Sequence, residues 1–214
     1  MTASAAGRPD APIALSRVQH RRKRMLALLA VPLVALVAVT RSWGEADGVA
    51  HHFVEAIGWF AIVACIIGRT WCTLYIGGRK KAELVRRGPY SIVRNPLYLF
   101  TLAGAVGIGL STGSVLLGAG LGLVVFLVFD SVIRREERWL ADQLGADYRA
   151  YLAEVPRWWP RLGRWRDDRS LTISPALVAG TFKDAALFAL AIPALEILES
   201  LQDWGIVPVL LLLP

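Results

Sequence analysis

Four long apolar runs constrain this chain more strongly than any other feature of its sequence. The runs cover residues 25–39, 49–76, 97–110 and 115–133, and short polar or basic segments separate them. A helix needs about 20 predominantly apolar residues to cross a membrane. Only 19% of the residues are charged, against about 25% in soluble domains. The sequence therefore predicts an all-α fold, a polytopic membrane helix bundle.

The apolar tail after residue 174 is interrupted by charges, glycine and prolines. From it we expect one more membrane helix or a re-entrant hairpin, which brings the total to about five transmembrane helices. The predicted organisation is a disordered basic N-terminus (1–24), N-terminal transmembrane helices (25–68), a core unit (69–160), and a linker with a C-terminal apolar helix or hairpin (161–214).

The basic residues lie mainly beside the apolar runs, at 20–24, 79–87 and 134–138. Lys and Arg number 24 against 17 Asp and Glu, which gives a net charge of +7. Lys and Arg that flank membrane helices are typical of cytoplasmic segments, and they bind anionic headgroups. We therefore expect an integral protein of the bacterial inner membrane whose active site faces the cytoplasm. Its expected partners are membrane lipids, not nucleic acid.

The third and fourth apolar runs are separated only by the short turn Ser111-Thr112-Gly113-Ser114. Gly109 and Gly113 are four residues apart, as are Gly118 and Gly122, and small residues at this spacing let helices approach closely. A helical hairpin is therefore expected. Asp130, near the end of the fourth run, lies four residues before Arg134, and this spacing predicts an ion pair.

Beyond residue 134 the sequence becomes amphipathic. Apolar residues recur at intervals of three and four, which is typical of a helix lying on the membrane surface, namely Leu140, Leu144, Tyr148, Tyr151 and Val155. We expect this amphipathic helix to lie along the cytoplasmic surface or to cap the bundle, where it would cover a cofactor pocket.

The cysteines and histidines do not have the spacing of a metal site or of a disulfide framework. Cys65 and Cys72 are seven residues apart in or near one apolar helix, and they are interpreted as buried free thiols. His51 and His52 are adjacent and are expected to mark a loop. No metal site is predicted.

The segment from Gly88 to Tyr98 carries the most specific local signal. Asn95 precedes Pro96 at the start of the third run, so Asn95 is expected to cap the helix and Pro96 to occupy its first position. The N-terminal amides and the helix dipole favour an anion. Tyr90 and Tyr98 add aromatic faces, and Arg94 adds a charge. The alternative is an ordinary junction between a loop and a helix.

The hairpin brings this junction close to Glu136 and Glu137, at the cytoplasmic end of the fourth run. Amides on one side and a carboxylate on the other would suit a zwitterionic amino-acid group. Adjacent helical residues diverge by about 100°, so at most one glutamate faces the pocket, and we favour Glu136. Alternatively, both glutamates pair with neighbouring arginines on a solvated face.

In its order of motifs, the chain resembles the isoprenylcysteine carboxyl methyltransferase and phospholipid methyltransferase superfamily of integral membrane enzymes. The matching residues span roughly 69–160 and are Leu84-Val85, Gly88-Pro89-Tyr90, Arg94-Asn95-Pro96-Leu97-Tyr98, Glu136-Glu137, Leu140, Leu144-Gly145, Tyr148, Tyr151 and Val155-Pro156. Two departures are Asn95, where the family usually has His, and Phe100, where it usually has Gly.

The resemblance implies S-adenosyl-L-methionine as the methyl donor. The cofactor-binding positions that carry over are Leu84, Val85, Tyr90, Asn95, Pro96, Leu97, Tyr98 and Glu136, with Glu137 beside them. The family's carboxyl methyltransferases have a substrate-contacting arginine, for which Arg94, Arg134 and Arg135 are the candidates here. No catalytic residue is predicted.

The expected function is transfer of a methyl group to a lipophilic acceptor, either a prenylcysteine-like carboxylate or a phospholipid amine. One alternative is a methyltransferase that acts on a small thiol or another small lipophile. The other is a non-enzymatic membrane scaffold subunit, which would have no affinity for S-adenosylmethionine.

Overall fold

The computed structural model describes residues 34–42, 48–77 and 84–213. The chain divides into two compact units, Met1–Leu36 and Val37–Pro214, and the second contains all the elements discussed below. These are β1 (Thr40–Ser42), α2 (Val49–Ile76), α3 (Pro89–Ile92), α4 (Pro96–Leu110), α5 (Val115–Glu154), the 3₁₀ turn η1 (Leu162–Arg164), α6 (Pro175–Ala186), the 3₁₀ turn η2 (Leu187–Leu190), α7 (Ala191–Asp203) and β2 (Leu211–Leu213). The basic N-terminus and most of the first predicted span lie outside the described residues.

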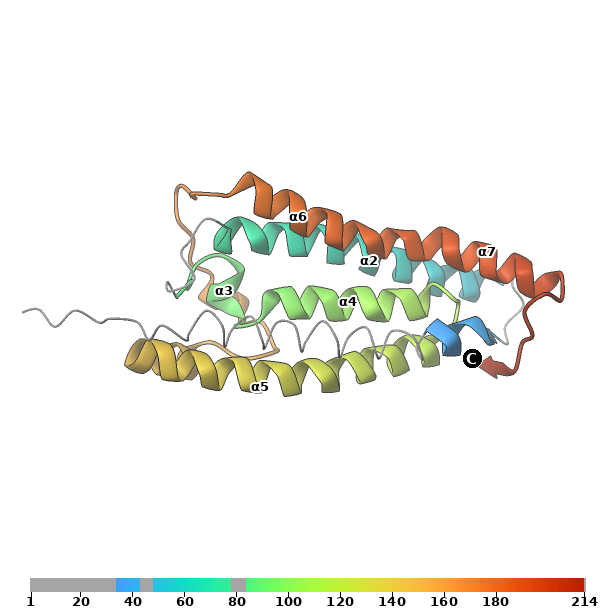
Figure 1. Ribbon diagram of the computed structural model, residues 1–214, viewed down its shortest axis with the longest axis horizontal. Helices are drawn as coiled ribbons and strands as arrows, with labels where there is room; N and C mark the ends of the chain where they lie inside the picture. Colours follow the sequence, from blue (N-terminus) through green and yellow to red (C-terminus); the bar gives the residue numbers. More distant parts are fainter. Residues whose placement is uncertain (1–33, 43–47, 78–83, 214) are drawn as a thin grey trace, which may run out of the picture. The chain divides into compact units, whose positions relative to one another are not determined.

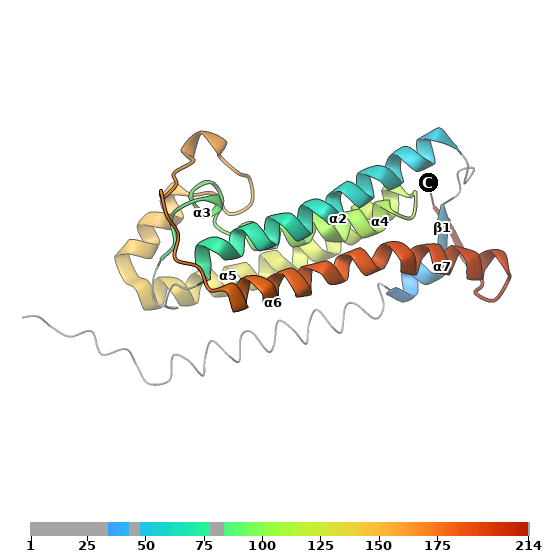
Figure 2. The same cartoon turned by 90° about the horizontal axis from the view of Figure 1, so that it is seen from above.

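The long helices of the second unit pack side by side in the order α5, α4, α2, α6 (Figures 1 and 2). The bounds of α2 and α4 confirm the second and third apolar runs as helices. Among the described helices, α2 and α5 are long and apolar enough to span a membrane, and α4 is a shorter apolar helix. The total of about five spans stays a prediction.

The α4–α5 hairpin is confirmed, and glycines allow its close packing. A methyl group added at Gly109 would lie 2.5 Å from Gly118 Cα, so only a hydrogen fits there. Ser114 ends the turn and caps α5, because its side-chain oxygen accepts from the amide of Leu117 at 3.2 Å. The predicted ion pair is also present, with Arg134 Nε 2.6 Å from Asp130 Oδ2.

The predicted amphipathic pattern falls in the second part of α5. The element runs for 40 residues and consists of two helical parts joined at a kink at Gly145, whose φ of 62° and ψ of −132° are not helical. Glycine tolerates a positive φ, which explains why the kink occurs at this residue. That the second part caps a pocket on the cytoplasmic side stays a prediction.

One expectation about the start of α2 is wrong. His51 and His52 do not mark a loop but lie in the first turn of α2, where they contact Glu55 at 3.5 Å and 3.1 Å. Such pairs three and four residues apart favour a helix. The described fold is mostly helical, as predicted, and its strands β1 and β2 form one short parallel pair with Thr40 opposite Leu211.

The chain after α5 first packs against α3 and then becomes helical. In the segment 161–169, Arg161 N donates to Ile92 O at 3.0 Å and Gly88 N donates to Arg166 O at 2.7 Å. Trp165 stacks on Trp71 of α2, with ring centroids 5.6 Å apart. Then α6, η2 and α7 follow one another along a single helical path (Figure 1), with α6 and η2 beside α2. This path corresponds to the helix of the two expected alternatives, and that it spans the membrane stays a prediction.

Candidate active site

A buried charge network joins the start of α4, the middle of α5 and the segment after α5. Arg94 Nη1 lies 2.9 Å from Glu137 Oε1, and Arg157 Nη2 lies 2.6 Å from Glu137 Oε2. Only 7% of the Glu137 side chain is exposed. The hydrogen bond to Glu137 raises the pKa of Arg157 above its usual value. Two arginines thus neutralise one buried carboxylate and fix three segments to one another.

The side chain and the backbone amide of Arg94 form hydrogen bonds to other groups of the protein. Besides Glu137, its guanidinium donates to the carbonyl oxygens of Leu152 and Val155, and its own amide donates to Pro156 O at 2.9 Å. These bonds hold the chain that leaves α5 against the start of α4. Arg94 therefore positions backbone in this structure, although the sequence suggested it as a contact for substrate.

Glu136, the neighbour of Glu137, points toward a different partner. The Tyr98 hydroxyl donates to Glu136 Oε2 at 2.9 Å, and the Tyr98 ring packs edge-on against Phe129, with centroids 4.9 Å apart. The two glutamates thus have separate environments, one in the arginine network and one beside α4. This difference agrees with the expected divergence of adjacent helical residues.

Asn95 occupies the N-cap position of α4, but the expected side-chain capping bond is absent. Its φ of −126° and ψ of 56° differ from the extended conformation that capping residues usually adopt. Its Nδ2 is buried and has no hydrogen-bond partner among the described residues. The amides of Tyr98 and Leu99 both donate to Asn95 O at 3.1 Å. These two amides are therefore not free to bind an anion, and the first turn of α4 offers fewer free amides than the sequence suggested.

Tyr90, Val85 and Leu84 belong to, or pack against, two buried apolar clusters. Tyr90 and Val85 belong to a buried cluster with Cys72 and Tyr75, against which Leu97 packs, and Leu84 packs against a second cluster that contains Tyr148 and Tyr151. Burial raises the pKa of Tyr90 well above its usual range, so the phenol is neutral. Its hydroxyl has no partner in the described chain. Cys65 and Cys72 are free and buried, as predicted.

Pro96 is buried at the first position of α4, as expected. Arg134 and Arg135 are exposed. Arg134 reaches the network around Glu137 only indirectly, because it pairs with Asp130, which lies 3.7 Å from Arg157 Nη1. Arg157 is a member of that network that the sequence analysis missed. Its position directly after Val155-Pro156 was the available signal, because that motif returns the chain to α4.

Phe100 stands on α4 where the related enzymes usually have Gly, and its ring lies against Gly68 of α2. A methyl group added at Gly68 would lie 2.2 Å from Phe100 Cδ1, so the ring packs directly on the backbone at Gly68. A large side chain on α4 is thus accommodated by the absence of one on α2.

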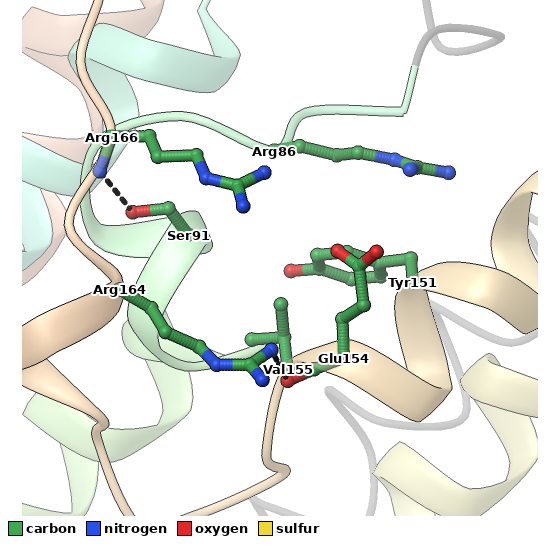
Figure 3. A pocket seen from close by; sticks show the side chains of 7 residues that line it. All are labelled: Arg86, Ser91, Tyr151, Glu154, Val155, Arg164 and Arg166. Atoms are coloured by element: carbon green, nitrogen blue, oxygen red, sulfur yellow. Dashed lines mark hydrogen bonds between the residues drawn. The ribbon is translucent and has the colours of Figure 1, made fainter.

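An open depression borders α3 and the end of α5, next to Tyr151 (Figure 3). It is lined by Arg86, Ser91, Tyr151, Glu154, Val155, Arg164 and Arg166. Tyr151 joins it to the candidate site, because its hydroxyl donates to Tyr90 O at 2.8 Å. Arg86 lies over the Tyr151 ring, 5.8 Å from the centroid. Three arginines and one glutamate give this depression a positive balance.

The described residues contain no group of three or more His, Cys, Asp or Glu placed to hold a metal ion. What the site offers is a carboxylate held by Tyr98, two buried groups able to donate hydrogen bonds, and apolar walls. Such an arrangement suits a molecule that carries both an ammonium and a carboxylate.

Comparison with known proteins gives a consistent family assignment. The sequence model of the phospholipid methyltransferase family matches residues 48–147. The chain is 30% identical over 196 residues to the nickel-cobalt-cadmium resistance protein NccN of Alcaligenes xylosoxydans xylosoxydans, covering 92% of this chain and 91% of the relative. It is also 30% identical over 205 residues to the cobalt-zinc-cadmium resistance protein CzcN of Cupriavidus metallidurans, covering 92% and 93%. No solved structure matches the chain significantly.

Proposed function

Since this chain belongs to the phospholipid methyltransferase family, within the isoprenylcysteine carboxyl methyltransferase-like superfamily, we propose that it is a membrane enzyme that moves a methyl group from S-adenosylmethionine to a lipophilic acceptor. One observation carries this proposal. Glu136 accepts a hydrogen bond from Tyr98 and lies on the hairpin whose other helix starts beside two buried donors, Tyr90 Oη and Asn95 Nδ2, for which the described residues provide no hydrogen-bond partner.

These residues fit the amino-acid part of S-adenosylmethionine. Glu136 would hold the ammonium, while Tyr90 Oη and Asn95 Nδ2 would donate to oxygen atoms. Buried polar groups are normally hydrogen-bonded, and a bound donor molecule would supply the acceptors that these two lack. Leu84, Val85, Pro96 and Leu97 would form the apolar walls, and Glu137 would keep the site in shape through Arg94 and Arg157.

When bound, S-adenosylmethionine supplies a methyl group on a sulfonium, so that the acceptor's lone pair bonds to the methyl carbon as the C–S bond electrons return to sulfur. The protein's task is then to align acceptor and methyl group and to exclude water, which can account for several kcal/mol of the barrier. A carboxylate acceptor needs no base, whereas a protonated amine must first lose its proton. No histidine is present in residues 84–213, which favours a carboxylate, a thiolate or a free amine.

The setting we propose is the bacterial inner membrane, with the site on the cytoplasmic side. The apolar character of α2 and α5 and the basic residues around 79–87 and 134–138 support this orientation.

The proposal is tested with the purified protein, S-adenosylmethionine labelled in its methyl group, and two acceptors: phosphatidylethanolamine and an S-prenylated N-acetylcysteine. We expect label in at least one product and its loss in Glu136→Gln. Asp142→Asn, which removes an exposed carboxylate on the same helix, is the matched control and should retain activity. A wild-type protein that does not bind S-adenosylmethionine would refute the proposal and favour the scaffold alternative.

A second role is suggested by the two relatives, which are named as metal-resistance proteins. We propose that methyl transfer by this chain contributes to resistance against divalent transition-metal ions. The test is growth on cobalt, nickel, zinc and cadmium salts of a strain that lacks the gene, complemented with wild type or with Glu136→Gln. Rescue by wild type alone supports an enzymatic role, whereas equal rescue by both supports a scaffold.

A further inference from the structure

Arg69 is a charged residue inside a helix long and apolar enough to span a membrane. Its Nη1 donates to Thr101 Oγ1 of α4, while its Nε is buried and has no hydrogen-bond partner in the described chain. No carboxylate among the described residues pairs with Arg69. Charged residues within membrane helices are costly and normally pair with another group. This arginine therefore has a positive charge for which the described residues provide no counter-ion.

The position of Arg69 relates it to the candidate active site. Thr101, its partner, donates to Leu97 O at 2.7 Å and lies three residues beyond Tyr98, a rise of about 4.5 Å along α4. Leu97 packs against the buried cluster that contains Tyr90. Arg69 thus lies about one helical turn further into the apolar part of the bundle than the residues proposed to hold S-adenosylmethionine.

Buried polar atoms without partners gather at this end of α2. There are four such side-chain atoms among the described residues, and three of them are Arg69 Nε, Tyr90 Oη and Asn95 Nδ2. The fourth, His51 Nδ1, lies at the opposite end of α2. All three groups near the site can donate hydrogen bonds. Tyr90 Oη and Asn95 Nδ2 are assigned above to S-adenosylmethionine, so Arg69 Nε needs an acceptor oxygen from another ligand.

We propose that Arg69 binds the anionic group of the methyl acceptor, either the phosphate of a phospholipid or the carboxylate of a lipidated amino acid. This inference rests on the proposed methyltransferase function. Thr101 engages Nη1, which leaves the edge formed by Nε and Nη2. That edge can hold two oxygens of a phosphate or carboxylate side by side, and an arginine binds such groups more specifically than a lysine does. The anionic group would thus anchor the acceptor on the apolar side of the methyl donor.

Direct binding to the full-length protein in detergent tests the proposal, with native mass spectrometry as the readout. The ligands are phosphatidylethanolamine, an S-prenylated N-acetylcysteine, and diacylglycerol, which has no anionic group. Arg69→Gln removes the charge but can still donate to Thr101. Thr101→Val removes the contact between α2 and α4 but keeps the charge. Arg149→Gln removes an equal charge at an exposed position of α5.

Arg69→Gln should weaken binding of at least one anionic ligand tenfold or more and leave diacylglycerol unaffected, while Thr101→Val and Arg149→Gln should each change binding less than threefold. Loss for phosphatidylethanolamine alone assigns a phosphate, loss for the prenylated compound alone assigns a carboxylate, and loss for both assigns an anionic group in general. Equal binding by wild type and Arg69→Gln, or equal losses in Arg69→Gln and Thr101→Val, overturns the proposal. Should Arg69→Gln fail to fold, Arg69→Lys replaces it, because it keeps the charge but loses the two-oxygen edge.

Calorimetry with S-adenosylmethionine on the same samples separates this inference from the proposed function. If the inference is correct, Arg69→Gln binds S-adenosylmethionine within twofold of wild type. Wild type that binds no S-adenosylmethionine contradicts the proposed function, whereas normal S-adenosylmethionine binding together with lipid binding independent of Arg69 contradicts this inference alone.

Discussion

The Tyr98 hydroxyl donates to Glu136 Oε2 across 2.9 Å and so links α4 to α5 within the candidate active site. Tyr98→Phe removes this bond but keeps the ring that packs against Phe129. A hydrogen bond to a charged group contributes about 1.5–3 kcal/mol. We expect S-adenosylmethionine to bind at least tenfold more weakly, and the unfolding temperature to fall by a few degrees because the bond also joins α4 to α5. Isothermal calorimetry and thermal unfolding measure the two effects, and unchanged affinity would show that Tyr98 does not orient Glu136.

The two adjacent glutamates should respond differently to the same substitution. Glu136→Gln removes the proposed partner of the cofactor's ammonium, so the affinity for S-adenosylmethionine should fall about ten- to a hundredfold. Glu137→Gln instead leaves Arg94 and Arg157 without their buried carboxylate, which should cost about 3–5 kcal/mol of stability. Calorimetry and thermal unfolding of both variants provide the comparison. Equal effects on affinity and on stability would contradict these separate roles.

Asn95 should matter for the cofactor and not for the helix. Because its side chain makes no capping bond, Asn95→Ala should leave stability nearly unchanged while lowering S-adenosylmethionine affinity. Asn95→Asp should lower that affinity further, because it places a negative charge beside the cofactor's carboxylate. Ser114→Ala is the control, since Ser114 does cap α5 and its loss should cost about 0.5–2 kcal/mol. If Asn95→Asp binds S-adenosylmethionine as well as wild type does, the carboxylate does not lie at this helix end.

The two ends of α5 should be accessible from opposite sides of the membrane. Val115, at the start of the helix, is 57% exposed, and Ala150, near its end, is also exposed. A membrane-impermeant maleimide should label Val115→Cys in intact cells, and Ala150→Cys only after permeabilisation. The native Cys65 and Cys72 are fully buried and should give little background. Labelling of Ala150→Cys in intact cells would reverse the proposed orientation.

Gly88 should not tolerate a side chain. Its φ is +56°, and an added methyl group would lie 2.2 Å from Tyr75 Cε1. Gly88→Ala should therefore lower the unfolding temperature and displace Tyr75, whose hydroxyl donates to Asp167 at 3.1 Å. Gly163→Ala is the matched control, because nothing lies within 4 Å of the added methyl group. Similar unfolding temperatures for the two variants would contradict this account.

Local patterns predicted the helices well. The apolar residues 49–76 are a helix with those bounds, and Pro96 starts α4 as its residue type suggests. The glycine spacing predicted a close approach within the hairpin, which the structure shows at Gly109 and Gly118. These features depend on residues within one helix or one hairpin, and such short-range relations can be inferred from a single sequence.

Features that depend on distant segments could not be predicted. Glu137 meets Arg94, which precedes it by 43 residues, and Arg157, which follows it by 20, and no periodicity links these three. Asn95 was expected to cap α4 from its residue type, but its backbone conformation in the fold prevents this. The order of the 161–169 segment likewise depends on α3 and on Trp71, to which no sequence motif connects it.

The pairing of β1 with β2 has a consequence for how the protein is made. In this strand pair, Thr40 lies opposite Leu211, which follows it by 171 residues. During synthesis, therefore, β1 has no strand partner from the described chain until α2, α4, α5, α6 and α7 have all been translated. This contact of very high sequence separation must be among the last to form. Formation of the strand pair therefore indicates that these five helices have already been synthesised.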